Sequence, residues 1–300
     1  MNILEKIRRM ITDPPPAYLF EISPLGIAYG EAKQPQQASF RALPEGILSV
    51  SPLNDNIKQP ELFLAEIEQA FPVGNDKTRP AAVILPDYAS RLQVLDFDTF
   101  PSKPEEQQAL VRFRMKKTVP FDIETAAVNY YAQPSAIDSK RTEVVAALVS
   151  YEILGRYEAM FRDAGFQPGV VTTSALAALN LIQSNELALV AKLSGKTLTM
   201  LVLDGGRLRM ARCLEPENLT EEDVLAAIYP TLAYMEDVFA TKANKGKPER
   251  IWLCGFGVQA DDLASRWSDE LKVSVEVLKS RYGTPGPHNA GMLGFLEAAN

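Results

Sequence analysis

The stretch that decides the fold reads YLFEISPLGIAYGEA and covers residues 18–32. It holds two strand-like apolar runs, residues 18–22 and 26–32, with only Ser23, Pro24 and Leu25 between them. So short a link predicts an antiparallel hairpin, because a parallel return needs a crossover of about a dozen residues. A third strand is predicted over residues 39–43, and an amphipathic helix over residues 60–71.

The same pattern returns in the second part of the chain. Strand-like runs cover residues 187–192, 198–203 and 208–213, and a long helix is predicted over 221–240. The sequence Asp204-Gly205-Gly206 between the last two runs is a strong hairpin signal, because glycine tolerates positive φ. A meander followed by a helix at residues 17–72 and again at 187–241 predicts two related α/β halves. The cleft between two such hairpins is a natural place for a nucleotide.

The residues between these repeats mix short strands and helices, which predicts a small inserted α+β subdomain. Its strands are expected at 82–85, 92–97, 126–132 and 143–149, and its helices at 104–117 and 151–163. The resulting division of the chain is an N-terminal helix (1–16), the start of the first half (17–79), the insertion (80–165) and the second half together with a helix that closes the first half (166–300).

Composition and charge exclude several classes of protein. The 300 residues are 46% apolar and 23% charged, which is ordinary for a packed soluble protein. The net charge of −7 argues against binding to nucleic acid, which needs a basic face. Two separated cysteines and one histidine, His288, predict neither a disulfide scaffold nor a metal site, and they support no catalytic triad.

Residues 1–11 have an amphipathic helical pattern. Ile3, Leu4 and Ile7 share one side with Met10 and Ile11, and basic side chains lie largely opposite. Two interpretations stay open for this segment. It packs on the body of the protein, or it makes peripheral contact with an anionic membrane surface.

Several stretches of the chain resemble one family of known proteins. They are LPD (85–87), RLQVLDFD (91–98), FPSKPEE (100–106), LVRFR (110–114), KTVPFD (117–122), NYY (129–131) and the C-terminal AGMLGFL (290–296). From residue 17 to residue 298 the chain resembles the PilM family of actin-like proteins of type IV pilus assembly, which is related to the division protein FtsA. The resemblance implies an α/β actin-like fold, with duplicated ribonuclease H-like halves and an inserted α+β subdomain.

The resemblance also implies a partner and a location. Proteins of this family hold the short cytoplasmic N-terminal peptide of the bitopic membrane protein PilN, in the cleft beside the inserted subdomain. They are cytoplasmic and lie at the inner membrane. Our candidates for the walls of a peptide groove in this chain are Arg112, Arg114, Phe121 and Tyr130.

Actin-like proteins bind ATP and Mg²⁺, so the resemblance also implies a nucleotide site. The candidate residues are Glu21, Ser23 and Gly26 in the first hairpin, Ser194, Gly195 and Thr197 in the second, and Gly255 and Gly257 after a later strand.

The nucleotide site departs from the family pattern at both hairpins. Glu21 replaces the expected aspartate, Pro24 has no N–H to offer a phosphate, and Lys192 stands where an acid or asparagine belongs. We therefore expect a degenerate site in an adaptor protein without a catalytic residue. A working actin-like ATPase is the alternative. A weaker alternative is an NAD-dependent enzyme, because residues 255–260 fit G-x-G-x-x-A and Glu276 lies about 20 residues further on.

Overall fold

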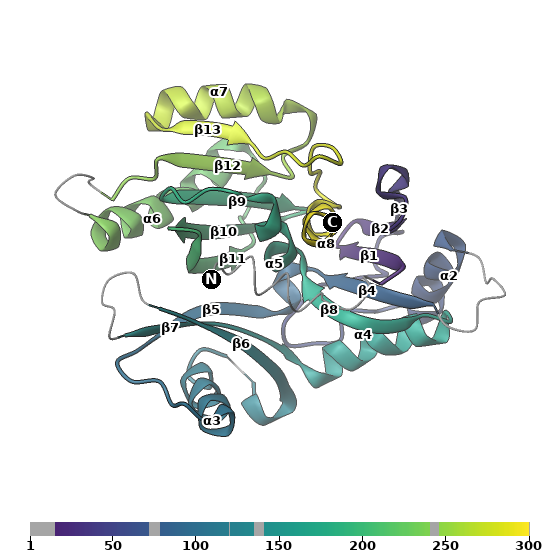
Figure 1. Cartoon of the computed structure of the whole chain (residues 1–300). Helices are drawn as coiled ribbons and strands as arrows, with labels where there is room; N and C mark the ends of the chain where they lie inside the picture. The colour runs from purple at the N-terminus through teal and green to yellow at the C-terminus, as the bar shows by residue number, and fades with distance from the viewer. Residues whose placement is uncertain (1–15, 72–78, 120, 135–140, 241–245, 300) are drawn as a thin grey trace.

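The computed structural model describes residues 16–71, 79–119, 121–134, 141–240 and 246–299 of the chain. Within these ranges the strands form two five-stranded sheets and one three-stranded sheet (Figure 1). The helix predicted over residues 1–11 lies outside the described residues. In the described part, no helix is both long and apolar enough to span a bilayer.

The first half is built from two separate stretches of chain. Its elements are β1 (Tyr18–Ser23), β2 (Gly26–Glu31), β3 (Ser39–Ala42), α2 (Pro60–Ala70), β4 (Pro80–Leu85), α4 (Tyr151–Asp163), β8 (Gln167–Thr173) and α5 (Ser174–Ala178). The strand order is β3-β2-β1-β4-β8. The predicted hairpin β1–β2 is antiparallel, and β4 and β8 run parallel to β1. Sequence analysis missed β8 and α5.

The second half repeats this arrangement. Its elements are β9 (Ala188–Ser194), β10 (Thr197–Asp204), β11 (Arg207–Leu214), α6 (Glu221–Phe239), β12 (Arg250–Cys254), α7 (Ala260–Leu271) and β13 (Ser274–Val277). The strand order is β11-β10-β9-β12-β13, again with a meander followed by two parallel strands. Each strand of one sheet has a counterpart at the same place in the other, so the predicted duplication is confirmed.

The inserted subdomain is smaller than predicted. It consists of β5 (Arg91–Phe97), α3 (Pro104–Met115), β6 (Ala126–Pro134) and β7 (Thr142–Ser150), with strand order β5-β7-β6. The predicted limits of 80–165 are wrong at both ends, because β4 lies inside the first sheet and α4 contributes to the core of the first half. The insertion therefore covers residues 91–150. It lies below the second half in Figure 1 and to the left of α4 of the first half, with β5 beside β11.

Alternating side chains divide the core into layers. On β1, Phe20 and Ile22 face the outer core beneath α2 and α4, whereas Leu19 faces the core between the halves. Helices α6 and α7 cover the outer face of the second sheet. The core between the halves is closed by α5 and by α8 (Ala290–Ala299).

Two glycines bring α8 unusually close to α5. A Cβ built on Gly291 would lie 2.8 Å from the Ser174 Cα, and one built on Gly294 would lie 2.1 Å from the carbonyl oxygen of Ala177. No side chain fits at either contact, so the C-terminal motif AGMLGFL is explained by this helix crossing. The crossing fixes the position of the α5 N-terminus, which reaches the candidate site.

Candidate functional site

The turns of the two equivalent hairpins contact each other. Gly195, in the β9–β10 turn, has a φ of 58°, and a Cβ built on it would lie 3.4 Å from the Cβ and Cγ of Pro24 in the β1–β2 turn. The ring of Pro24 therefore packs against the opposite turn. In the actin-like pattern these two turns flank the phosphates, so their contact closes the space between them.

A segment of the chain between β13 and α8 joins both turns. The Ser194 hydroxyl donates a 2.8 Å hydrogen bond to the carbonyl oxygen of Pro287. The Ser23 hydroxyl lies 3.2 Å from Nδ1 of His288. The His288 ring is stacked on Phe40, with centroids 4.0 Å apart and an interplanar angle of 12°. His288 is thus a packing residue at this junction, and burial lowers the pKa of its imidazole.

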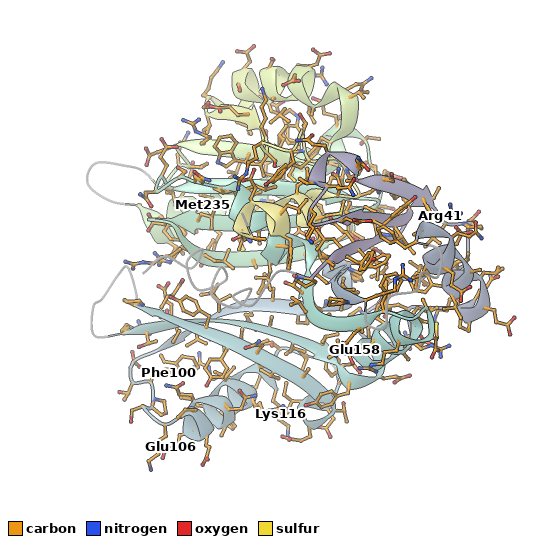
Figure 2. All side chains as sticks on the ribbon, turned by 45° about the vertical axis from the view of Figure 1, so that its right-hand side comes forward. Arg41, Phe100, Glu106, Lys116, Glu158 and Met235 are labelled. Atoms are coloured by element: carbon orange, nitrogen blue, oxygen red, sulfur yellow. The ribbon has the colours of Figure 1, made fainter. Side chains whose placement is uncertain are left out.

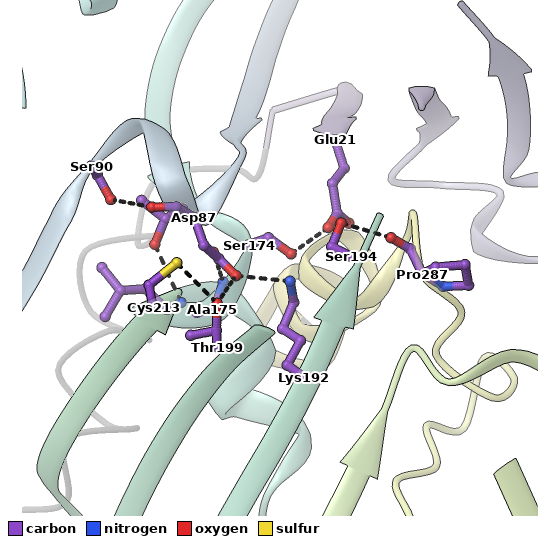
Figure 3. A network of polar contacts seen from close by, with 12 residues as sticks. Glu21, Asp87, Ser90, Ser174, Ala175, Lys192, Ser194, Thr199, Cys213 and Pro287 are labelled. Atoms are coloured by element: carbon purple, nitrogen blue, oxygen red, sulfur yellow. Dashed lines mark hydrogen bonds and ion pairs between the residues drawn. The ribbon is translucent and has the colours of Figure 1, made fainter. Parts of the chain in front are cut away.

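Behind the turns lies a buried network of charges from both halves (Figure 3). Asp87 is separated from the end of β4 by Pro86 alone and opens a single 3-10 turn, η2 (Asp87–Ala89). Its carboxylate accepts a 2.9 Å hydrogen bond from Nζ of Lys192 on β9, and the two side chains are only 4% and 2% exposed. The same carboxylate also accepts from the Thr199 hydroxyl at 2.9 Å and from the Ala175 N–H at 2.6 Å.

Glu21 from β1 completes the network. Its carboxylate accepts hydrogen bonds from the Ser174 hydroxyl and, at 2.7 Å, from the Met292 N–H. Burial raises the pKa of Glu21, although the positive charge of Lys192 and these hydrogen bonds oppose the rise. Burial by itself would lower the pKa of Lys192, but the charges of Asp87 and Glu21 outweigh it and raise that pKa. Lys192 is therefore a charged ammonium close to two carboxyl groups.

The predicted nucleotide residues lie around this closed junction. Ser23 donates to the carbonyl oxygen of Gly26 at 3.2 Å, and a Cβ on Gly26 would lie 2.2 Å from the Arg41 carbonyl oxygen. Thr197 is buried at the start of β10.

The two glycines predicted after the later strand, Gly255 and Gly257, have different surroundings. Gly255 has a φ of 81°, and a Cβ there would lie 2.1 Å from the Leu193 carbonyl oxygen, so this glycine packs against the chain's own backbone. Gly257 has a φ of 76° and faces open space. The structure thus brings Glu21, Ser23, Ser194, Gly195 and Gly255 together and leaves Gly257 outside.

These residues do not fit a nucleotide with its Mg²⁺. The Asp87 carboxylate forms an ion pair with an ammonium where a metal ion would have to bind, and Lys192 cannot act as a metal ligand because its ammonium has donors only. Pro24 offers no N–H and packs on Gly195, where a phosphate would need backbone donors. The bonds from Ser23 and Ser194 to the segment of Pro287 and His288 use the hydroxyls that a phosphate would contact.

The sheet around residues 255–260 also differs from the dinucleotide-binding fold that the NAD-dependent alternative requires. The sheet that contains β12 places an antiparallel meander on one side, rather than the succession of parallel strands of a dinucleotide-binding fold. Glu276, the proposed ribose acid, forms a 2.6 Å ion pair with Arg250.

A separate groove lies between the inserted subdomain and the first half. Its volume is about 540 Å³, and most of its lining is apolar. One wall is formed by β6 and β7, with Ala127, Tyr131 and Val145, and the other by β8 and α5, with Val171 and Leu176. Both β6 and β8 are edge strands of their sheets, so each has one edge without a neighbouring strand within the described residues.

Of the four residues predicted to form the groove, only Tyr130 borders it, and its hydroxyl donates a 3.1 Å hydrogen bond to Oε1 of Gln107 on α3, on the opposite face of the inserted sheet. Arg112 donates to the carbonyl oxygens of Ile123 and Ala126 at 2.7 and 3.1 Å, which fixes the loop after α3. The Arg114 guanidinium lies 5.1 Å from the ring centroid of Phe97.

Phe121 packs into the core beneath α3, on the opposite face of the inserted sheet from the groove. Figure 2 shows this side of the subdomain at Phe100, Glu106 and Lys116, far from Arg41 and Met235 in the two halves. The side chains of all four predicted groove residues thus lie on the α3 side of the insertion.

Sequence analysis named Lys192 and Glu21 but did not identify Asp87 as the ion-pair partner of Lys192. Asp87 could have been found, because a carboxylate after a buried strand that runs parallel to β1 must lie at the same sheet edge as the end of β1. Ser174 and Ala175 gave no comparable signal, because the strand before them was not predicted.

Comparison with known proteins supports the fold. The sequence matches no protein-family model and no curated protein. The structure is similar to a PilM–PilN type IV pilus biogenesis complex, with a TM-score of 0.73 and 19% identity over 95% of this chain and 98% of that chain. It is also similar to a Bacteroides thetaiotaomicron protein of actin-like ATPase fold and unknown function, with a TM-score of 0.50 and 11% identity over 99% and 98% of the two chains. The actin-like fold and the structural resemblance to PilM proteins are confirmed.

Proposed function

We propose that this protein is a cytoplasmic adaptor of a type IV pilus or related assembly machine, peripheral at the inner membrane. It binds the short cytoplasmic N-terminal peptide of a bitopic, PilN-like membrane protein. The observation that carries the proposal is the apolar groove between the insertion and the first half, in a chain whose fold matches a PilM–PilN complex over almost its whole length.

The groove suits an extended peptide. The edges of β6 and β8 offer backbone N–H and C=O groups, and a peptide can add to such an edge as a further strand. Successive side chains of a strand point to opposite faces, so every second side chain of the peptide enters the groove. The apolar surface of Tyr131, Val145 and Leu176 provides the contacts that offset the entropy lost on ordering the peptide.

We further propose that the nucleotide site is degenerate and that the adaptor does not depend on ATP and Mg²⁺. The contact of Pro24 with Gly195 and the ion pair of Lys192 with Asp87 support this part of the proposal. Thermal unfolding with and without Mg-ATP tests it. A ligand at 100 times its Kd stabilises a protein by about 2.7 kcal/mol, so a clear rise in Tm would favour the ATPase alternative.

The decisive test of the adaptor is capture of its partner. The full chain, immobilised and exposed to detergent-solubilised membranes of its own organism, is expected to retain a bitopic assembly protein. A fluorescent peptide copied from the N-terminus of that protein then measures the Kd directly, with a scrambled peptide as control. Failure of the peptide to bind, while the whole partner is retained, would remove the groove from the proposal.

Membrane contact through residues 1–11 is tested separately. Sedimentation with vesicles of anionic lipid compares the full chain with a chain beginning at residue 16. Equal sedimentation of both would assign no membrane contact to this segment.

A further inference from the structure

We propose that the Lys192 ammonium is a built-in cation, which takes the place of a divalent metal ion between the two halves and holds them in one fixed arrangement. The inference deepens the second part of the proposed function, the independence from nucleotide. It does not depend on the peptide groove.

The duplication places Lys192 and Glu21 at equivalent positions. Glu21 stands two residues before Ser23, at the end of β1, and Lys192 stands two residues before Ser194, at the end of β9. β1 and β9 are the central strands of their sheets, and their hairpin turns meet. One position of the internal symmetry thus carries an acid in one half and a base in the other, so the two charges attract across the junction.

Asp87 adds a second carboxylate from the first half, so Lys192 of the second half interacts with two acidic side chains. Because β4 runs parallel to β1, Asp87 and Glu21 lie at the same edge of the first sheet. Lys192 comes from the other half and forms a 2.9 Å ion pair with Asp87, while its charge also acts on Glu21 (Figure 3). Two carboxyl groups that face a buried cation are the arrangement by which acidic side chains hold a metal ion.

The remaining contacts fix both carboxyl groups in place. Ser174 and Met292 donate to Glu21, and Ala175 and Thr199 donate to Asp87. These donors come from α5, α8 and β10, so the network includes elements of both halves. A metal ion and its nucleotide can leave such a site, whereas the ammonium is covalently attached to β9. The halves therefore have no cycle of loading and release.

The distance between the halves tests the inference in the whole protein. Spin labels on Glu68→Cys in α2 and Asp269→Cys in α7, both exposed positions on helices outside the junction, report on the two halves by pulsed dipolar spectroscopy. The native thiols are poor targets for labelling, because burial raises the pKa of Cys213 and of Cys254 to about 12. The chain without the two introduced cysteines, treated with the same spin label, is the control for labelling of these native thiols.

We expect one narrow distance distribution in the doubly labelled protein. About 5 mM MgCl₂, alone or with an equal concentration of ATP, is expected to leave this distribution unchanged, although it is more than about 100 times a Kd in the micromolar range. Lys192→Met, which keeps most of the length of the side chain but not the charge, is expected to broaden or lengthen the distance distribution. Lys192→Arg, which keeps the charge, is expected to retain much of the narrow distribution. A second population in the protein with Lys192, or a shift on adding Mg-ATP, would overturn the inference.

Chemical rescue keeps the inference testable if Lys192→Met fails to fold. Lys192→Ala leaves room for a free alkylammonium ion beside Asp87, so n-propylammonium chloride is expected to raise its Tm above that in sodium chloride of equal concentration. Propanol, the uncharged analogue, is expected to have no such effect. Equal effects of the cation and of propanol would mean that Lys192 only fills space. Peptide binding enters none of these readouts, so their failure leaves the adaptor proposal intact.

Discussion

The groove can be blocked by a substitution that does not weaken the fold. Gly169 lies on β8 and lines the groove, its φ is not positive, and a Cβ built on it meets no atom within 4 Å. A side chain can therefore be added without a clash. Glycine loses more conformational freedom on folding than other residues, so we expect Gly169→Leu to be at least as stable as the natural chain.

The magnitude follows from what the new side chain excludes. The groove measures about 540 Å³, which accommodates only a few apolar side chains of a peptide. A leucine at residue 169 displaces one of them, and the burial of one such side chain contributes roughly 1.5–3 kcal/mol. Since each 1.4 kcal/mol is a tenfold change in affinity, the Kd of the peptide is expected to rise roughly 10- to 100-fold.

Fluorescence anisotropy of the labelled peptide measures this change, and urea unfolding measures stability in the same preparations. Gly155→Leu is the matched control, because Gly155 lies on the exposed face of α4, has open space around it and does not line the groove. We expect the control to bind the peptide like the natural chain. Tight binding by Gly169→Leu with unchanged stability would refute the assignment of the groove.

Three further outcomes are expected. Tyr131→Ala weakens peptide binding in the anisotropy assay, whereas Phe121→Ala, on the α3 face, leaves the Kd unchanged; the reverse order would move the site to α3. Gly255→Ala lowers the urea midpoint strongly, because its Cβ would lie 2.1 Å from the Leu193 carbonyl oxygen, and a midpoint equal to that of the natural chain would contradict the close contact. Burial raises the pKa of Glu21, so the native state binds its proton more tightly than the unfolded chain, and stability from this group is lost as pH rises above about 4.3. Glu21→Gln is therefore expected to flatten the fall in unfolding free energy as the pH rises above about 4.3, and equal slopes in both proteins would count against it.

Local sequence signals predicted most of the fold, because the deciding features are short-range. A three-residue link between apolar runs determines the β1–β2 hairpin, and its repetition at β9–β10 determines the duplication. Strand β8 was missed because Pro168 and Gly169 interrupt its apolar pattern, and both residues are depleted in strands. Its place is set by parallel pairing with β4, which no local pattern expresses.

The site was predictable only in part. The lysine at position 192 led us to predict that a metal ligand is missing, but its pairing with Asp87 joins residues 105 positions apart and has no local sequence signal. The groove residues were misplaced for a geometric reason. Neighbouring side chains on a strand point to opposite faces, so β6 gives Ala126 to the core under α3 and Ala127 to the groove. Without the strand register, the sequence around α3 and β6 does not show which side chains face α3 and which face the groove.

The two sites are connected by the short helix α5. Ser174 and Ala175 donate hydrogen bonds to Glu21 and Asp87, and the next two residues, Leu176 and Ala177, line the wall of the groove. A groove between two strand edges grips a peptide only if the distance between its walls is constant. A charge network that holds α5 still keeps one of those walls in place, which a site that opened with every nucleotide cycle would not do. The proposed replacement of a removable cation by Lys192 is therefore consistent with the proposed peptide groove, because a fixed junction supplies the rigidity that such a groove requires.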